Sequence, residues 1–102
     1  MKIWLDDVRP APEGQYVWYK TAEEVIERLM TTPGLIEVID FDNDLGTTLE
    51  GWHVAKITAA LARAGMLQPI ELKVHTQNPI AKVRIVDYFH IAEEAWNEDQ
   101  TR

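Results

Sequence analysis

Short apolar runs alternate with longer amphipathic segments along this chain, and turn-forming or polar residues close each run. The short runs are rich in β-branched and aromatic residues, which favour strands. Strands are therefore predicted over residues 2–5, 16–19, 35–39 and 70–74.

The longer segments predict three helices from their apolar periodicity and from the signals at their ends. Thr21 and Glu24 form a capping-box pattern, and the pair Asn78 and Pro79 is typical of a helix start. The helices expected from these signals run from the Thr21 cap to Pro33, from Trp52 to Ala64, and from Pro79 to about Ala95.

Strands that alternate with helices predict a parallel sheet with right-handed crossovers. A chain of 102 residues is long enough for one hydrophobic core and too short for two. We expect a single three-layer α/β domain over residues 1–96, with about four parallel strands and helices on both faces of the sheet. A loose tail is expected over residues 97–102.

Net charge, cysteine content and the length of the apolar runs exclude several classes of function. The formal net charge of -7 argues against a surface that binds duplex DNA, because such surfaces need clustered Lys and Arg. The absence of cysteine excludes disulfides and thiolate metal sites, which leaves carboxylate and imidazole as the strong metal ligands. No apolar run has the length of a membrane span or of a signal peptide, so a soluble, cytoplasmic protein without a membrane partner is expected.

Polar clusters follow the first, third and fourth predicted strands, at residues 6–7, 42–44 and 75–78. The carboxyl ends of parallel strands lie at one edge of a sheet, where α/β folds bind ligands, so these clusters are expected to converge. Crowded carboxylates repel one another unless a cation neutralises them. The predicted ligands of a divalent metal, Mg²⁺ or Mn²⁺, are accordingly Asp6, Asp7 and Asp42.

The spacing of Asp40, Asp42 and Asp44 also suggests a calcium loop, but the surrounding residues do not fit one. An EF-hand loop needs Gly at its sixth position and Glu at its twelfth. Counted from Asp40, these positions hold Leu45 and Gly51. Asp40 is therefore interpreted as an ordinary strand carboxylate, and Asp42 as part of the site.

The three clusters together resemble a known family. Receiver domains of two-component signalling carry an acidic pair after the first strand and an aspartate after the third, but no later strand here supplies their phosphate-contacting lysine. A closer resemblance is to the receiver-like family named for predicted cyclic-phosphate processing, whose motifs read D-D-x-R-P, D-H-D-L-G and H-S-x-N-P. The matching segments are residues 6–10, 42–46 and 75–79, in which Asn43 replaces the family His and Thr76 the family Ser.

This resemblance implies a receiver/flavodoxin-like fold and a small metal-dependent phosphoesterase that processes a cyclic phosphate, either in a cyclic nucleotide or at an RNA 2′,3′-cyclic phosphate end. His75 is the expected general acid or base, because imidazole changes charge near neutral pH. Asp42 and Asp44 complete the catalytic set, and Asp44 either orients His75, binds a second metal or caps its own turn. The residues expected at the phosphate are Arg9, Thr76 and Asn78.

Two other functions remain open. The first is a non-catalytic receiver-like module that binds a nucleotide or a protein partner, and Asn43 favours it because an amide is neither an acid nor a base. The second is a phosphotransfer receiver, which the missing lysine disfavours. The expected partner is thus a phosphorylated nucleotide or RNA end under the leading hypothesis, and a protein under the first alternative.

Overall fold

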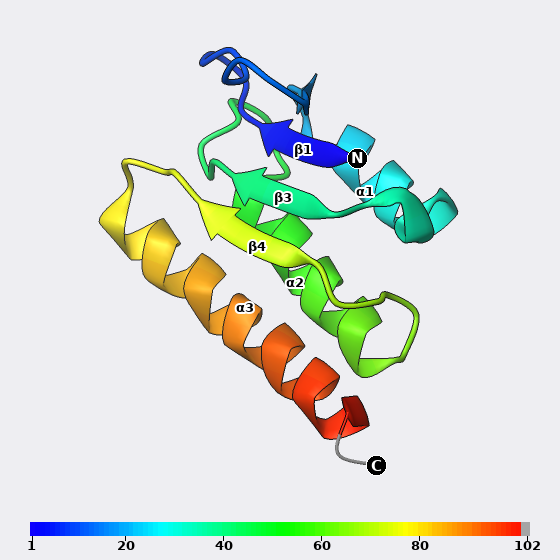
Figure 1. The fold of residues 1–102 in the computed structure, drawn as a ribbon. Helices are drawn as coiled ribbons and strands as arrows, with labels where there is room; N and C mark the ends of the chain where they lie inside the picture. Colours follow the sequence, from blue (N-terminus) through cyan, green and yellow to red (C-terminus); the bar gives the residue numbers. More distant parts are fainter. Residues whose placement is uncertain (101–102) are drawn as a thin grey trace.

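The computed structural model describes the backbone of residues 1–100 and the side chains of residues 1–98. Four parallel strands form one sheet in the order β2-β1-β3-β4, and the strands are β1 (Lys2–Leu5), β2 (Tyr16–Tyr19), β3 (Val38–Phe41) and β4 (Glu71–Val74). The helices are α1 (Ala22–Thr31), α2 (Gly51–Arg63) and α3 (Pro79–Gln100), with a short 3-10 helix η1 (Pro33–Leu35) before β3. This arrangement, drawn in Figure 1, confirms the predicted receiver/flavodoxin-like α/β fold.

One face of the sheet forms the core. Ile3 pairs with Ile39 and Leu5 pairs with Phe41, and all four side chains are fully buried. Alternation along parallel strands places these residues on the same face. They belong to one hydrophobic cluster that draws on all three helices, including Val25 and Leu29 of α1, Val54 and Ala55 of α2, and Ile85 and Phe89 of α3.

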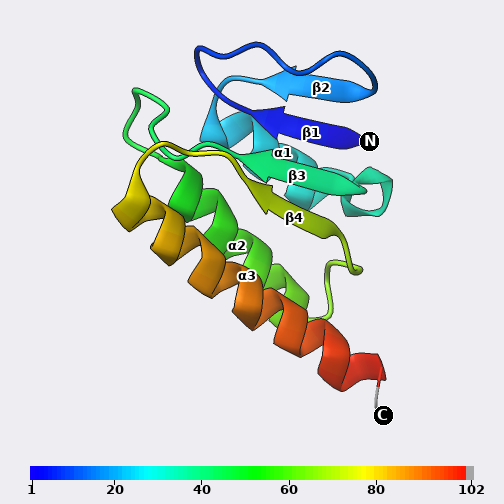
Figure 2. The same ribbon diagram turned by 60° about the vertical axis from the view of Figure 1, so that its left-hand side comes forward.

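The opposite face carries no helix within residues 1–100. Its side chains include Trp4, which is partly exposed, and Glu71 and Lys73, which are exposed. Helix α2 packs against both α1 and α3, and Figure 2 shows α2 and α3 side by side along the sheet with α1 behind β1. The sheet therefore has helices on one face, whereas the prediction placed them on both. The physical reason is the link from β1 to β2, residues 6–15, which is a loop and supplies no helix to the second face.

The third strand begins later than predicted. The chain turns through η1 before β3, so the strand expected over residues 35–39 is Val38–Phe41. Pro33 stands at the start of η1, where its missing amide costs no hydrogen bond. As a consequence, Asp40 lies inside the strand and Asp42 directly follows it.

Helix α3 passes the domain boundary predicted after residue 96 and continues to Gln100. The indole of Trp96 is buried, and its Nε1 donates a hydrogen bond to the carbonyl of Leu67 at 2.9 Å, which anchors the end of the helix. Residues 101–102 of the predicted tail lie outside the described residues. Over the part of the chain that the structure describes, no helix is both long and apolar enough to cross a bilayer.

Candidate functional site

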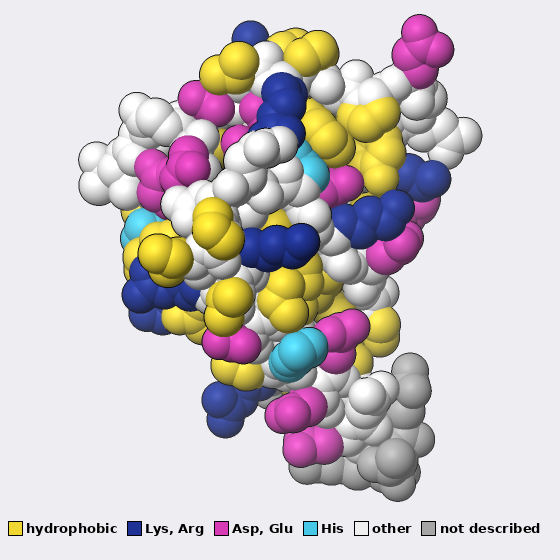
Figure 3. Space-filling view, turned by 90° about the vertical axis from the view of Figure 1, so that its left-hand side faces the viewer, with side chains coloured by type: hydrophobic (Ala, Val, Ile, Leu, Met, Phe, Trp, Pro, Cys, Tyr) yellow, Lys and Arg dark blue, Asp and Glu magenta, His cyan; other side chains and the backbone are white. Residues whose placement is uncertain are grey.

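The loops after β1, β3 and β4 meet at the edge of the sheet toward which the strand arrows in Figure 1 point. They bring together Asp6, Asp42 and His75, one residue from each loop. One ligand atom from each residue lies within 4.8 Å of the other two, and both carboxylates are buried. Figure 3 looks onto this edge and shows acidic, basic and histidine side chains close together in its upper half. The strand order thus brings the three clusters to one place.

Asp6 is held by the loop that follows β1. Its Oδ1 accepts hydrogen bonds from the amides of Val8 at 2.9 Å and Arg9 at 2.7 Å. Its Oδ2 lies 3.0 Å from Nε2 of His75 and 3.3 Å from Nε of Arg9. Burial raises the pKa of Asp6, but these partners outweigh burial and hold the pKa below its ordinary value. Asp6 is therefore a carboxylate at neutral pH.

Asp42 carries a less well compensated charge. Its Oδ1 accepts a hydrogen bond from the amide of Asn43 at 2.8 Å and lies 3.9 Å from Nη2 of Arg9. Burial raises the pKa of Asp42, and the charge of Asp6 raises it further. The Asn43 amide and the side chain of Thr76 lower the pKa, but the net shift is upward. Two buried carboxylates therefore lie at one edge, and an added positive charge would stabilise them.

The ring of His75 is fixed by contacts with three side chains. Its Nδ1 lies 2.7 Å from Oδ1 of Asp40, and its Nε2 lies 3.0 Å from Oδ2 of Asp6. One ring face stacks on the indole of Trp4, with centroids 3.8 Å apart and planes inclined by 3°. Burial lowers the pKa of His75, but the hydrogen bonds to Asp40 and Asp6 and the nearby negative charges outweigh it and raise the pKa above the ordinary value. The ring is therefore positioned to hold a proton at this edge.

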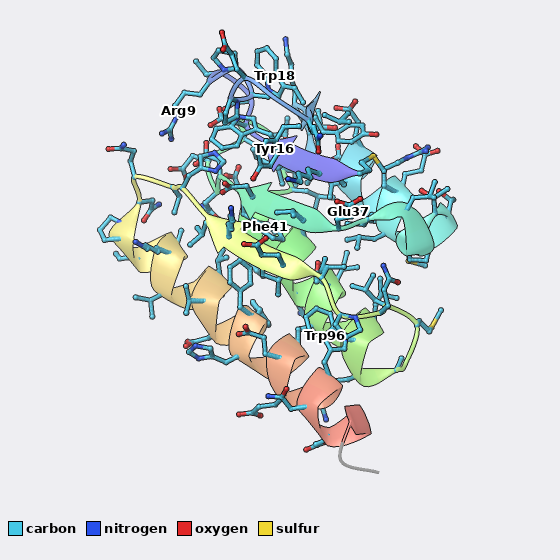
Figure 4. The ribbon with its side chains drawn as sticks, viewed as in Figure 1. Arg9, Tyr16, Trp18, Glu37, Phe41 and Trp96 are labelled. Carbon is cyan, nitrogen blue, oxygen red and sulfur yellow. The ribbon has the colours of Figure 1, made fainter. Side chains whose placement is uncertain are left out.

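Arg9 lies on the same loop as Asp6 and faces solvent. Its side chain is 43% exposed, and Figure 4 shows it at the end of the sheet where the strand arrows stop. Two indoles hold the backbone of this loop, because Nε1 of Trp4 donates to the carbonyl of Arg9 at 2.9 Å and Nε1 of Trp18 donates to the carbonyl of Asp6 at 2.6 Å. The guanidinium is thus an exposed cation on a fixed loop, which suits contact with an anion.

Asn43 ties the end of β3 to the start of α2. Its Oδ1 accepts a hydrogen bond from the amide of Trp52 at 3.1 Å, and its Nδ2 donates to Oδ1 of Asp44 at 3.0 Å. Its carbonyl accepts a hydrogen bond from the amide of Gly51 at 2.9 Å. A Cβ on Gly51 would lie only 1.9 Å from the carbonyl oxygen of Asp42, so the helix approaches the site more closely than any other residue type would allow. Asn43 therefore makes structural contacts at the position where the family motif has His.

Three predicted site residues lie at the margin of this group. Asp7 is not part of the ligand group found among the described residues, and its Oδ2 would lie 3.3 Å from a Cβ on Gly46. Oδ1 of Asp44 lies 3.5 Å from Nδ2 of Asn78, and Asn78 caps α3 by accepting a hydrogen bond from the amide of Ala81 at 3.1 Å. Metal binding by Asp7 and catalysis by Asp44 stay predictions.

The sequence patterns did not point to Asp40 and Trp4 as part of the site. The signal lies in the strand register, in which Asp40 pairs with Trp4 on one side and with Lys73 on the other. His75 follows Lys73 by two residues, so alternation places it on the same face as Asp40 and Trp4. That these three side chains are neighbours can be inferred only from the register of β1, β3 and β4.

A family model for the cyclic-phosphate processing receiver domain matches residues 1–90. The chain belongs to this family. The match spans all four strands and all three motif segments. Comparison with curated proteins and comparison with solved structures each gave no match.

The donor set of this cyclic-phosphate processing receiver domain fits a divalent cation. Asp6 and Asp42 are buried carboxylates from different loops, and the raised pKa of Asp42 shows that its charge is incompletely compensated. Carboxylate oxygens are the ligands that hard divalent cations prefer. The third member of the group, His75, offers an imidazole nitrogen beside them.

Proposed function

We propose that this domain is a metal-dependent phosphoesterase that opens a cyclic phosphate, either in a cyclic nucleotide or at an RNA 2′,3′-cyclic phosphate end. The observation that carries the proposal is the group of Asp6, Asp42 and His75, whose ligand atoms lie within 4.8 Å of one another. The family supports the class of substrate. The combination of two carboxylates and an imidazole supports the class of reaction.

In this proposal, one part of the site binds the metal cation and another part binds the phosphate. Asp6 and Asp42 would hold the cation, Mg²⁺ or Mn²⁺, which when bound polarises a phosphoryl oxygen and activates a water. Arg9, whose side chain is 43% exposed, binds the phosphate oxygens. Thr76 and Asn78 lie beside Asp42 and Asp44 respectively and line the same edge.

His75 moves the proton in this proposal. The oxygen of water bonds to phosphorus, and the bond from phosphorus to one ribose oxygen breaks. That ribose oxygen takes the proton from Nε2 of His75, and His75 regains a proton from the attacking water, so the product is a phosphomonoester. The hydrogen bonds to Asp40 and Asp6 favour the protonated ring, because they raise the pKa of His75. The ring thus carries the proton that the leaving oxygen needs.

The test is turnover of 2′,3′-cyclic AMP and 3′,5′-cyclic AMP by the whole chain with Mg²⁺ or Mn²⁺, with the phosphomonoester detected by ³¹P NMR. We expect Asp42→Asn and His75→Gln each to lower kcat by about 100-fold or more. His90→Gln is the matched control, because His90 is an exposed histidine of α3. Wild-type rates in both site variants would refute the assignment.

A second candidate is a non-catalytic module that binds a phosphorylated nucleotide or a protein partner. Asn43 favours it, because this side chain bonds to Trp52 and Asp44 and supplies no proton donor or acceptor of the kind that the family His offers. Saturable binding of a cyclic nucleotide without any phosphomonoester product, at every metal concentration, would favour this candidate over the phosphoesterase.

A further inference from the structure

The two carboxylates that face the ring of His75 are not equivalent. Oδ1 of Asp40 lies 2.7 Å from Nδ1, whereas Oδ2 of Asp6 lies 3.0 Å from Nε2. Asp6 also accepts hydrogen bonds from two backbone amides and pairs with Arg9. Asp40 has His75 as its hydrogen-bond and ion-pair partner among residues 1–98. Asp40 is thus the nearer and less shared acceptor of the two.

We infer that Asp40 is a positioning residue for His75, which holds a proton on Nδ1 and thereby directs Nε2 toward Asp6 and the reacting phosphate. For its catalytic consequence the inference rests on the proposed function. An imidazole that donates from one nitrogen to a carboxylate has its tautomer and its ring orientation set by that bond. Only Nε2 then remains for proton transfer at the edge of the sheet.

The elements that carry this arrangement are rigid. Asp40 is the third residue of β3, at the centre of the parallel sheet, and its register partner Trp4 lies in β1. The Trp4 indole lies parallel to the imidazole at 3.8 Å, which keeps the ring from leaving the plane in which Nδ1 meets Asp40. His75 itself is tied to β3, because its amide donates to the carbonyl of Phe41 at 2.9 Å. A site built on strands in this way is held more precisely than one built on loops alone.

The charge of Asp40 is what the positioning needs. An amide at the same place accepts a hydrogen bond from a protonated Nδ1 or donates one to a bare Nδ1, so both tautomers of the ring become available. Loss of such an orienting partner typically lowers activity by about 10–100-fold. The effect falls on kcat, because Asp40 lies behind His75 as seen from Asp6 and does not reach the phosphate.

The test compares Asp40→Asn with the control Glu71→Gln. Glu71 is an exposed carboxylate on β4, two register positions from Asp40 on the same face of the sheet, and its ion-pair partner is Lys73. Two readouts are needed: ¹⁵N NMR of the His75 ring in the metal-free and Mg²⁺-bound protein, at a pH where the ring is neutral, and kcat and KM for 2′,3′-cyclic AMP. Melting curves confirm that both variants are folded.

We expect the neutral ring to carry its proton on Nδ1 in the wild type and in Glu71→Gln, and to shift toward the Nε2 tautomer in Asp40→Asn. Asp40→Asn should lower kcat by about 10–100-fold with KM changed by no more than about twofold. Ring signals of Asp40→Asn that match the wild type, or a kcat that matches Glu71→Gln, would overturn the inference. If the wild type opens no cyclic phosphate, the proposed function fails and the ring signals alone decide whether Asp40 positions His75.

Discussion

Replacing Asp42 with Asn is expected to stabilise the metal-free protein and to abolish its stabilisation by metal. Asp42 is buried, and burial together with the charge of Asp6 raises its pKa, so at neutral pH the ionised form opposes folding. Asparagine has nearly the same shape and keeps an oxygen that can accept the hydrogen bond from the Asn43 amide. The same substitution therefore raises stability without metal and lowers it, relative to the wild type, when metal is present. An ordinary buried carboxylate that binds no metal would not show this reversal.

The magnitude follows from the distances. Ligand oxygens of Asp6 and Asp42 lie within 4.8 Å, which corresponds to a repulsion of about 3.5 kcal/mol at an effective dielectric constant of about 20. Arg9 lies 3.9 Å from Asp42 and is 43% exposed, so its attraction offsets about 1 kcal/mol or less, and protonated His75 offsets a further part. We expect a net gain on the order of 1 kcal/mol in the free energy of unfolding, or about 4–8 °C in Tm for a domain of this size.

The assay is thermal and urea unfolding near neutral pH, first in EDTA and then with Mg²⁺ or Mn²⁺. Metal at about 100 times its Kd should stabilise the wild type by about 2.7 kcal/mol and leave Asp42→Asn unchanged. Asp87→Asn, which removes an exposed carboxylate of α3, should behave as the wild type in both conditions. A loss of stability in Asp42→Asn in EDTA would refute the argument from uncompensated charge, and a retained metal shift would refute its role as a ligand.

Three further substitutions test the surroundings of the site. Gly51→Ala should destabilise the fold by about 3 kcal/mol or more in urea unfolding, because its Cβ would lie 1.9 Å from a backbone oxygen, whereas Gly34→Ala, with no atom within 4 Å of the added Cβ, should cost less than about 1 kcal/mol. Asn43→Ala should lower the free energy of unfolding by about 1–2 kcal/mol in the same measurement, since it removes the hydrogen bond to the first turn of α2. A loss no larger than that caused by an alanine substitution at an exposed position would contradict this role. The stability that His75 contributes to the metal-free protein should be complete below its unfolded pKa of 6.5 and should disappear as pH rises through its raised folded pKa. Unfolding of His75→Gln across that pH range should lack this dependence, and His90→Gln should retain it.

The order and type of the elements were predictable because their signals are local. Residue composition marks the strands, and apolar periodicity together with end signals marks the helices. The rule that parallel strands present their carboxyl ends together then brings Asp6, Asp42 and His75 to one edge without any knowledge of distances. The capping of α3 by Asn78 follows from a pair of adjacent residues in the same way.

The parts that could not be predicted depend on long-range geometry. The role of Asp40 follows from the register of three strands, and a shift of one residue would turn its side chain to the other face. Among residues 1–100, the absence of helices from the second face depends on the path of residues 6–15, whose prolines and glycine indicate a loop but not its direction. The contacts of Asn43 depend on how closely α2 approaches β3, which is set by packing and not by any local pattern.

The close approach of Gly51 to Asp42 also places the start of α2 directly against the backbone of the site. Backbone touches backbone at this point, and a hydrogen bond from Gly51 to Asn43 holds the two segments together. A ligand that pushes the end of β3 toward α2 therefore has to move the helix, because no flexible side chain lies between them to absorb the displacement. Helix α2 packs along α3, so a displacement of α2 would also press on α3.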